Sequence, residues 1–294
     1  MKLQGIFPAI ATPFDHKGDL YKVKLQHNIE KWNQLALGGY LVTGSTGETP
    51  YLSTEEKLQV WEWAAQWADP NKTLLAGTSA ESARETIHLT NRAAEMGYKA
   101  ALVLAPHYFR ALMNRMETQM LFFRTVADQT KIPILVYHFP QVTGIDLTPE
   151  LVGALSEHPN IIGMKDSSGN FEGTKKFLGA VKPGFQVMTG SASALAVSLA
   201  AGCTGAVLAL ANAIPYACIS IYEAHRTRET DAAMDWQNRI ACAAQLVATK
   251  YSIPGLKYAM DLNGYYGGPP RLPLTVVTPD AQKEIAQAFE GLQG

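Results

Sequence analysis

The sequence lacks the features that mark several large classes of protein. It has only three cysteines, Cys203, Cys218 and Cys242, with no CxxC spacing, and their odd number argues against a disulfide framework. No apolar run approaches the roughly 20 residues of a membrane-spanning helix, and the first residues lack the apolar segment of a signal peptide. The formal net charge is -1, so no basic field points to nucleic acid or to an anionic membrane. We expect a cytoplasmic protein with its cysteines in the core and with no nucleic-acid or membrane partner.

The motifs of several common enzyme mechanisms are also missing. Neither GxGxxG nor GK[ST] is present, which weighs against an open sheet that binds a dinucleotide or a phosphate. The seven histidines are scattered and HExxH is absent, so a metal-dependent mechanism has little support. GxSxG is absent too, which disfavours a serine hydrolase. If the protein is an enzyme, its catalytic residues therefore do not belong to any of these motifs.

What the chain does contain is a regular alternation of apolar segments and helical patterns. Strands are predicted at residues 5–14, 39–43, 73–77, 100–106, 132–137, 161–164, 185–191 and 204–210. Helices are predicted at 22–37, 53–69, 82–97, 115–129, from 148 onward, at 171–181, 193–201, 215–226, 230–249, 254–262 and 279–291. Capping boxes are expected at Ser53–Glu56 and at Ser82–Glu85.

The strands read as near-continuous apolar runs, which is typical of a parallel sheet buried on both faces. About eight such strands, each followed by a helix, predict an α/β fold of the (β/α)8 TIM-barrel type. Residues 1–226 would form the barrel, and residues 227–294 a C-terminal helical appendage packed on it. An open doubly wound sheet is the competing architecture, but it normally carries one of the missing glycine-rich turns.

Residues 161–169, Ile-Ile-Gly-Met-Lys-Asp-Ser-Ser-Gly, place Lys165 where a buried strand ends. Desolvation disfavours the charged ammonium and so favours the free amine that Schiff-base chemistry requires. Taken alone, the pattern fits better a lysine that reaches the surface or pairs with Asp166. The predicted barrel changes this balance, because active sites of such barrels lie at the carboxyl ends of the strands.

Polar residues follow several other predicted strands. The segment Gly44–Glu48 offers the hydroxyls of Ser45 and Thr46 and a run of backbone N–H groups, including that of Gly47. Such an arrangement suits a carboxylate, although an ordinary turn explains it equally well. Tyr137 and Tyr108 also follow strands, and each taken alone fits core packing better than catalysis. Their neighbours His138 and His107 fit loop positions better than a place in the site.

Three segments, in this order, carry a resemblance to a known family. They are Gly44–Glu48 followed by Leu52-Ser53, then Tyr137–Gly144 (Tyr-His-Phe-Pro-Gln-Val-Thr-Gly), then Gly163–Asp166 (Gly-Met-Lys-Asp). Together they resemble the dihydrodipicolinate synthase / N-acetylneuraminate lyase family of pyruvate-handling class I aldolases, over essentially the whole chain. The resemblance implies a (β/α)8 barrel with C-terminal helices, a homotetramer built as a dimer of dimers, a small-molecule substrate, and no external cofactor or metal.

The resemblance also implies a role for each matching residue. Lys165 would form the Schiff base with pyruvate or another 2-oxo acid, and Tyr137 would be the acid and base at the reacting carbon. Ser45, Thr46 and Gly47 would hold the pyruvate carboxylate. Tyr108 would reach into the neighbouring subunit's site and complete a hydroxyl relay with Ser45 and Tyr137. Val207 lies where the family uses a backbone carbonyl.

Departures from the pattern concern the second substrate. Dihydrodipicolinate synthases typically carry an arginine at the place of Val142, and valine cannot form a charge-assisted hydrogen bond with a carboxylate. The hydroxyl and N–H groups around Ser167 and Ser168 would suit a small carboxylate such as that of glyoxylate. Residues 158–167, 252–257 and 264–269 look most like 4-hydroxy-2-oxoglutarate aldolases. Dihydrodipicolinate synthase is the alternative, and a non-catalytic 2-oxo-acid sensor is a further one that the presence of Lys165 and Tyr137 disfavours.

Overall fold

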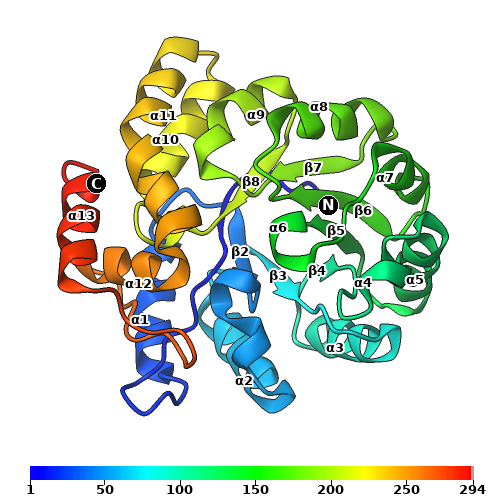
Figure 1. Cartoon of the computed structure of the whole chain (residues 1–294), viewed down its shortest axis with the longest axis horizontal. Helices are drawn as coiled ribbons and strands as arrows, with labels where there is room; N and C mark the ends of the chain where they lie inside the picture. Colours follow the sequence, from blue (N-terminus) through cyan, green and yellow to red (C-terminus); the bar gives the residue numbers. More distant parts are fainter. Residues whose placement is uncertain (293–294) are drawn as a thin grey trace.

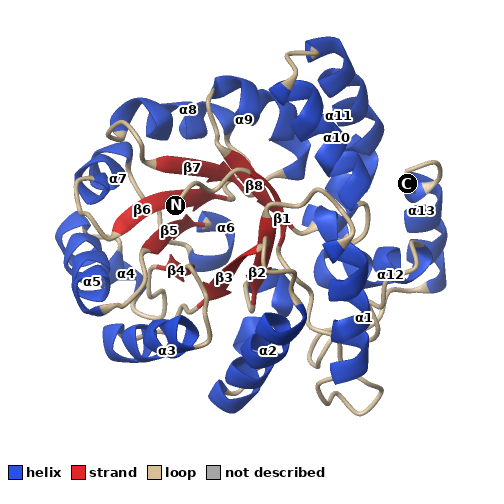
Figure 2. Ribbon diagram, turned by 180° about the vertical axis from the view of Figure 1, so that it is seen from behind, coloured by secondary structure: helices blue, strands red, loops and turns tan. Residues whose placement is uncertain are grey.

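The computed structural model describes residues 1–292 and contains a barrel of eight parallel strands. They are β1 (Gly5–Pro8), β2 (Gly39–Val42), β3 (Thr73–Gly77), β4 (Ala100–Leu104), β5 (Ile134–His138), β6 (Ile161–Asp166), β7 (Gln186–Thr189) and β8 (Gly205–Leu208). From β2 to β8 each strand pairs with the next, and β8 pairs with β1. A parallel bridge between Ala9 and Leu41 joins the end of β1 to β2, so the ring is closed (Figure 2). The predicted (β/α)8 barrel is confirmed.

Helices follow the strands and surround the barrel (Figures 1 and 2). They are α1 (Lys22–Asn33), α2 (Thr54–Trp67), α3 (Ala83–Glu95), α4 (Arg110–Met113), α5 (Met116–Gln129), α6 (Pro140–Thr143), α7 (Pro149–Ser156), α8 (Phe171–Ala180), α9 (Leu195–Ala201) and α10 (Pro215–Arg226). The short α6 differs from the others, because it lies across the centre of the barrel in both views. Since α6 follows β5 directly, it covers the carboxyl end of the barrel.

Both faces of the strands are buried, as the continuous apolar runs predicted. Every residue of β2, β4 and β5 is buried. One face of the strands fills the barrel with large apolar side chains, among them Phe7, Leu135 and Met188. Leu3 belongs to the same interior cluster, so the segment before β1 closes the amino end of the barrel.

Element boundaries differ from the sequence-based expectation where backbone chemistry intervenes. The first strand ends at Pro8, well before residue 14; Ala9 and Ile10 still donate N–H groups to Leu208 and Leu41, but Pro13 has no N–H to continue the pairing. The first helix ends at Asn33, four residues earlier than its apolar spacing suggested. Such spacing reports which face of a helix is buried more reliably than it reports the last turn.

One of the two expected capping boxes is complete. At the start of α2, Glu56 N–H donates to Ser53 Oγ at 3.2 Å, and Ser53 N–H donates to Glu56 Oε2 at 2.9 Å. At the start of α3, Glu85 N–H donates to Ser82 Oγ at 3.2 Å, which is half of the expected motif. The carboxylate of Glu85 instead faces α2, where Thr54 Oγ1 donates to it at 3.5 Å.

After α10 the chain is helical and lies outside the ring, beside α1 (Figure 1). It forms α11 (Thr230–Gln245), a π-helical turn (Leu246–Lys250), α12 (Ser252–Leu262) and α13 (Pro279–Phe289). The expected helix over 230–249 is thus interrupted at Gln245. The π-helical turn brings Lys250 to Glu284 of α13, with Nζ 2.6 Å from Oε1. Residues 293–294 of the predicted C-terminal segment lie outside the described residues.

The three cysteines all lie among residues 1–292 and differ in burial. Cys203 and Cys218 are buried, and burial raises the pKa of each thiol to about 12. Cys242 is exposed, so the prediction that it fills the core is wrong. Across these residues, no helix is long and apolar enough to cross a membrane, and no three His, Cys, Asp or Glu residues form a group that could hold a metal ion.

Candidate active site

Tyr137 on β5 and Lys165 on β6 are register partners near the carboxyl ends of two neighbouring strands. Nζ of Lys165 lies 3.4 Å from the Tyr137 hydroxyl oxygen and 4.5 Å from the centre of the ring. Lys165 is 6% exposed and Tyr137 is 5% exposed. The structure thus places a buried amine beside a phenol, at the end of the barrel where such enzymes hold their substrates. Together they can form a covalent bond with a carbonyl and move a proton near it.

Ser167 and Gly190 lie beside this pair. The hydroxyl of Ser167 lies 3.5 Å from that of Tyr137, at the long limit of a hydrogen bond. Gly190 follows β7, and a Cβ added there would lie 1.9 Å from Ser167 Oγ and 2.7 Å from Lys165 Cε. Only glycine therefore allows both side chains to adopt this arrangement. Gly190 is not among the site residues predicted from sequence, although a glycine at the carboxyl end of a barrel strand is a sign of close approach.

The candidate carboxylate-binding segment forms a 3₁₀ helix, η1 (Ser45–Gly47), after β2. Ser45 and Thr46 begin this turn, so their N–H groups have no partner within it. Gly47 differs, because its N–H donates to the Gly44 carbonyl at 3.0 Å. A Cβ on Gly47 would lie 2.9 Å from the carbonyl oxygen of Ile10, so this glycine allows the turn to pack on the chain after β1. The donors suited to a carboxylate are therefore those of Ser45 and Thr46.

Glu48, the next residue, is held in a buried ion pair. Its Oε1 lies 2.6 Å from Nζ of Lys257 on α12, and its Oε2 accepts the Arg271 N–H at 2.8 Å. Lys257 also donates to the carbonyl of Thr12 at 2.9 Å. Burial lowers the pKa of Lys257, although the Glu48 carboxylate opposes this shift. The pair anchors the η1 turn to the C-terminal helices, a link that the sequence analysis did not predict.

The structure does not bring every predicted site residue to Lys165. Tyr108, between β4 and α4, is 79% exposed, and its ring packs edge-on against Phe109. In the part of the chain that is described, the Tyr108 hydroxyl makes no hydrogen bond with Tyr137 or Ser45. The side chain of Val207 on β8 packs in the barrel interior, in the same cluster as Tyr137. Val142 lies on α6 and is 55% exposed.

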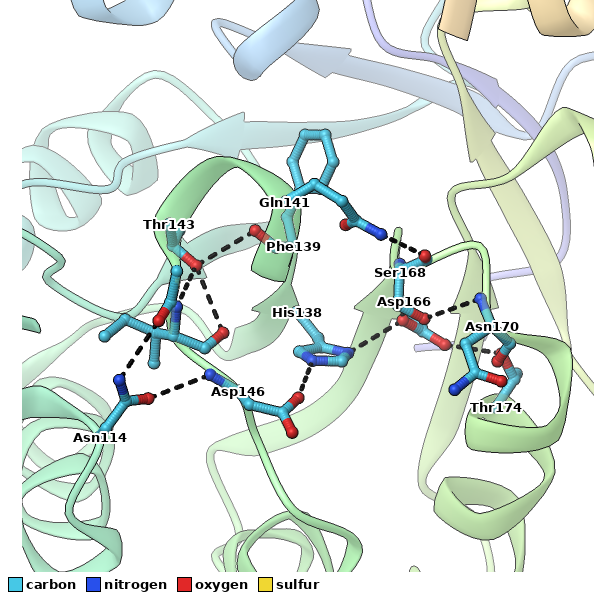
Figure 3. A network of polar contacts seen from close by, with 12 residues as sticks. Asn114, His138, Phe139, Gln141, Thr143, Asp146, Asp166, Ser168, Asn170 and Thr174 are labelled. Carbon is cyan, nitrogen blue, oxygen red and sulfur yellow. Dashed lines mark hydrogen bonds and ion pairs between the residues drawn. The ribbon is translucent and has the colours of Figure 1, made fainter. Parts of the chain in front are cut away.

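A second polar cluster lies one residue beyond the Tyr137–Lys165 pair (Figure 3). His138 and Asp166 are the next register partners on the same two strands, with Nδ1 3.0 Å from Oδ1. The other ring nitrogen, Nε2, lies 2.9 Å from Oδ1 of Asp146. Thr174 Oγ1 on α8 donates to Asp166 Oδ2 at 2.6 Å. His138 is therefore a strand residue on the face opposite to Tyr137, and the alternation of side chains along β5 was the signal for its position.

Electrostatics stabilise the charged forms of both partners in this cluster. Burial lowers the pKa of His138, but hydrogen bonds and charges from Asp166 and Asp146 outweigh it, and the net shift is upward. Burial raises the pKa of Asp166, but hydrogen bonds from His138, Thr174 and Ser168 hold that pKa below its ordinary value. A cationic histidine and an anionic aspartate are thus favoured behind the candidate active site.

A closed barrel with a buried lysine and a tyrosine at the carboxyl ends of neighbouring strands defines a (β/α)8 enzyme equipped for amine chemistry on a carbonyl compound. The model of the dihydrodipicolinate synthetase family matches residues 2–291, and the chain belongs to that family. Relatives in this family are named as synthases and aldolases, and the chain is an enzyme of this lyase and aldolase group.

Two curated relatives differ in their named activity. The chain is 31% identical, over 294 residues and 97% of each chain, to a 4-hydroxy-tetrahydrodipicolinate synthase of Exiguobacterium sp.. It is 30% identical, over 290 residues covering 97% of this chain and 93% of the relative, to a probable mitochondrial 4-hydroxy-2-oxoglutarate aldolase of Emericella nidulans. Among solved structures, the chloride-inhibited dihydrodipicolinate synthase of Acinetobacter baumannii in complex with pyruvate superposes with a TM-score of 0.94, at 27% identity and 99% coverage of each chain.

Proposed function

We propose that the protein is a Schiff-base-forming class I aldolase that acts on pyruvate and other 2-oxo acids and cleaves 4-hydroxy-2-oxoglutarate to pyruvate and glyoxylate. The observation that carries the proposal is the buried Nζ of Lys165, 3.4 Å from the hydroxyl of Tyr137. Two comparisons support it. The Acinetobacter baumannii relative is in complex with pyruvate, and the Emericella nidulans relative is named for this cleavage.

In the proposed reaction, the Lys165 amine attacks the C2 ketone, water leaves, and an iminium forms. The iminium accepts the electron pair of the C3–C4 bond when that bond breaks. Tyr137 gives a proton to the departing water, and the phenolate that remains takes the proton of the C4 hydroxyl as this oxygen becomes the aldehyde oxygen of glyoxylate. Tyr137 returns this proton to C3 of the enamine, and a water molecule then hydrolyses the iminium, which releases pyruvate and restores the amine. The chain supplies every group in this sequence, so the proposal includes no metal and no external cofactor.

The proposal gives the remaining residues supporting roles. The hydroxyl and N–H groups of Ser45 and Thr46 would hold the carboxylate next to the ketone. Tyr108 would act in the site of a second subunit of a homotetramer arranged as a dimer of dimers. Its exposure supports this role, because Tyr108, Phe109 and Leu112 place large apolar surface at one end of the barrel, as interfaces do.

Condensation of pyruvate with aspartate semialdehyde, the dihydrodipicolinate synthase reaction, is the second candidate. The name of the Exiguobacterium relative favours it. Val142 opposes it, because valine on α6 offers no charged donor to the carboxylate of the semialdehyde. The two candidates share the same Schiff base and differ only in the second substrate. A sensor that binds 2-oxo acids without turnover would need neither the amine nor the phenol.

Three measurements test the proposal. Sodium borohydride with pyruvate should add one pyruvyl-derived mass, and peptide mapping should place it on Lys165; a label on another lysine, or none in active protein, contradicts the proposal. Pyruvate release from 4-hydroxy-2-oxoglutarate should exceed consumption of pyruvate with aspartate semialdehyde, compared as kcat/KM. Activity should survive a metal chelator. Binding of 2-oxo acids without any turnover would favour the sensor.

A further inference from the structure

Two pairs of side chains share the ends of β5 and β6. The register joins Tyr137 to Lys165 and His138 to Asp166. Successive side chains of a strand point to opposite faces, so the first pair faces the barrel and the second faces the helices. The ring of His138 accordingly packs edge-on against Phe177 of α8, with the ring centres 5.2 Å apart. Any movement of one pair along the strands must move the other.

The contacts of His138 require a particular protonation state. Both ring nitrogens face carboxylate oxygens, Nδ1 at 3.0 Å from Asp166 and Nε2 at 2.9 Å from Asp146 (Figure 3). A neutral imidazole has one N–H donor and one acceptor, so it would turn a lone pair toward one of these carboxylates. Only the imidazolium donates to both. His138 is 4% exposed, so little water can replace either partner.

The two carboxylates differ in how firmly they are held. Asp166 also accepts hydrogen bonds from Thr174 Oγ1 at 2.6 Å and from the Ser168 N–H at 3.0 Å. The side chain of Asp146, in the loop before α7, is 78% exposed. Another titratable group near the cluster is the thiol of Cys203, whose pKa is raised by burial and by the charge of Asp166. No second cation shares the two carboxylates with His138 among the ion pairs of residues 1–292.

We propose that His138, as an imidazolium between Asp166 and Asp146, is a positioning residue that keeps Tyr137 aligned with Lys165 and sets an alkaline limit on turnover. This inference rests on the proposed function, in which Tyr137 and Lys165 react with the substrate. Loss of the imidazolium proton breaks one carboxylate contact, and the exposed Asp146 is the partner that can turn to water. The end of β5 is then less firmly held, and the phenol moves with it.

The test is the pH dependence of kcat and KM, from about pH 6 to about pH 10, for the wild type and three variants. Glutamine is neutral at every pH, so His138→Gln should lower kcat by about 10- to 100-fold with KM nearly unchanged. The fall of kcat at alkaline pH that comes from His138 should also disappear. Asp146→Asn keeps the imidazole of His138 but removes one of its two anionic partners. The fall of kcat at alkaline pH should therefore begin about one pH unit lower than in the wild type. His158→Gln is the control, because it removes a 2.9 Å contact with Asp128 in another part of the fold.

Three outcomes would overturn the positioning role. The first is a pH dependence of kcat in His138→Gln that equals that of the wild type. The second is a kcat in His138→Gln that is lower by the same factor at every pH, with its alkaline fall at the wild-type pH. The third is an alkaline fall of kcat in Asp146→Asn at the wild-type pH. If His138→Gln does not fold, Asp146→Asn alone tests the positioning role. The Asp146 side chain is exposed, so its replacement leaves the core intact. Borohydride trapping separates the two proposals, because a wild type that is labelled at Lys165 retains the proposed function even when the His138 variants contradict the positioning role.

Discussion

Glu48 and Lys257 form an ion pair of 2.6 Å in which each side chain is only 1% exposed. One partner follows the η1 turn at the carboxyl end of β2, and the other lies on α12 (Figure 1). The C-terminal helices therefore help to fix a turn at the same end of the barrel as Lys165. An arginine of the segment after α12, Arg271, adds a backbone N–H to the same carboxylate.

We expect Lys257→Met to destabilise the protein strongly. The variant keeps the volume of the side chain but leaves the Glu48 carboxylate buried without its cation. Breaking a buried ion pair in this way costs about 3–5 kcal/mol of the free energy of unfolding. Urea unfolding at a fixed protein concentration measures the loss, because assembly makes apparent stability depend on concentration.

Lys283→Met is the matched control for this prediction. Its contact with Asp280 is 3.7 Å long, and both side chains are exposed, so the free energy of unfolding should change by less than about 0.5 kcal/mol. Adding Glu48→Gln to Lys257→Met should recover part of the loss, since no charge is then left buried. A wild-type urea midpoint for Lys257→Met would show that the pair contributes nothing to stability.

Gly190→Ala should impair turnover more than folding. The new methyl group would lie 2.7 Å from Lys165 Cε and closer still to Ser167, so both side chains must move. Displacement of a reacting group by about 1 Å costs on the order of 10²-fold in rate. Gly179→Ala on α8 is the control, because its Cβ meets nothing within 4 Å and alanine favours a helix. Equal kcat values for the two variants would contradict the crowding at Lys165.

Tyr137→Phe should lower kcat by about 10²- to 10⁴-fold, because it removes the proton carrier while the ring and its packing remain. The ring stacks on Phe139, with centres 5.7 Å apart, so the urea midpoint should stay close to that of the wild type. Borohydride trapping should still label Lys165. A variant with wild-type turnover would reduce Tyr137 to a core residue.

Tyr108→Phe tests whether a second subunit completes each site. The variant should slow turnover only if the hydroxyl reaches a neighbouring Tyr137. Mixing and reassembling Tyr108→Phe with Lys165→Ala should then restore activity, because a site with Lys165 can receive Tyr108 from the other variant. Sedimentation measures the assembly in parallel. Activity of the mixture no greater than the sum of its parts would place the Tyr108 hydroxyl outside the reaction.

Local patterns predicted some parts of this molecule far better than others. The eight strands followed from apolar runs, and so did the places of Lys165 and Tyr137 at strand ends, whereas their proposed roles came from the resemblance. Gly47 illustrates the limit, since its N–H, expected to face a ligand, donates to the Gly44 carbonyl instead. The partnership of Glu48 with Lys257 was not predictable, because contacts between distant segments leave no periodic signal in one sequence.

The exposure of Val142 makes substrate choice testable with one substitution. Val142 lies on α6 over the carboxyl end of the barrel and is 55% exposed, so a longer side chain has room there. An arginine would offer a paired, charge-assisted contact to a second carboxylate, which valine cannot make. We expect Val142→Arg to shift the ratio of kcat/KM values from 4-hydroxy-2-oxoglutarate cleavage toward condensation with aspartate semialdehyde. Val142→Leu is the control, since it adds bulk without charge and should leave the ratio unchanged. A wild type that already prefers aspartate semialdehyde by a wide margin would refute the aldolase assignment. Its carboxylate site would then have to use donors other than a guanidinium at this position, such as the hydroxyl and N–H groups around Ser167.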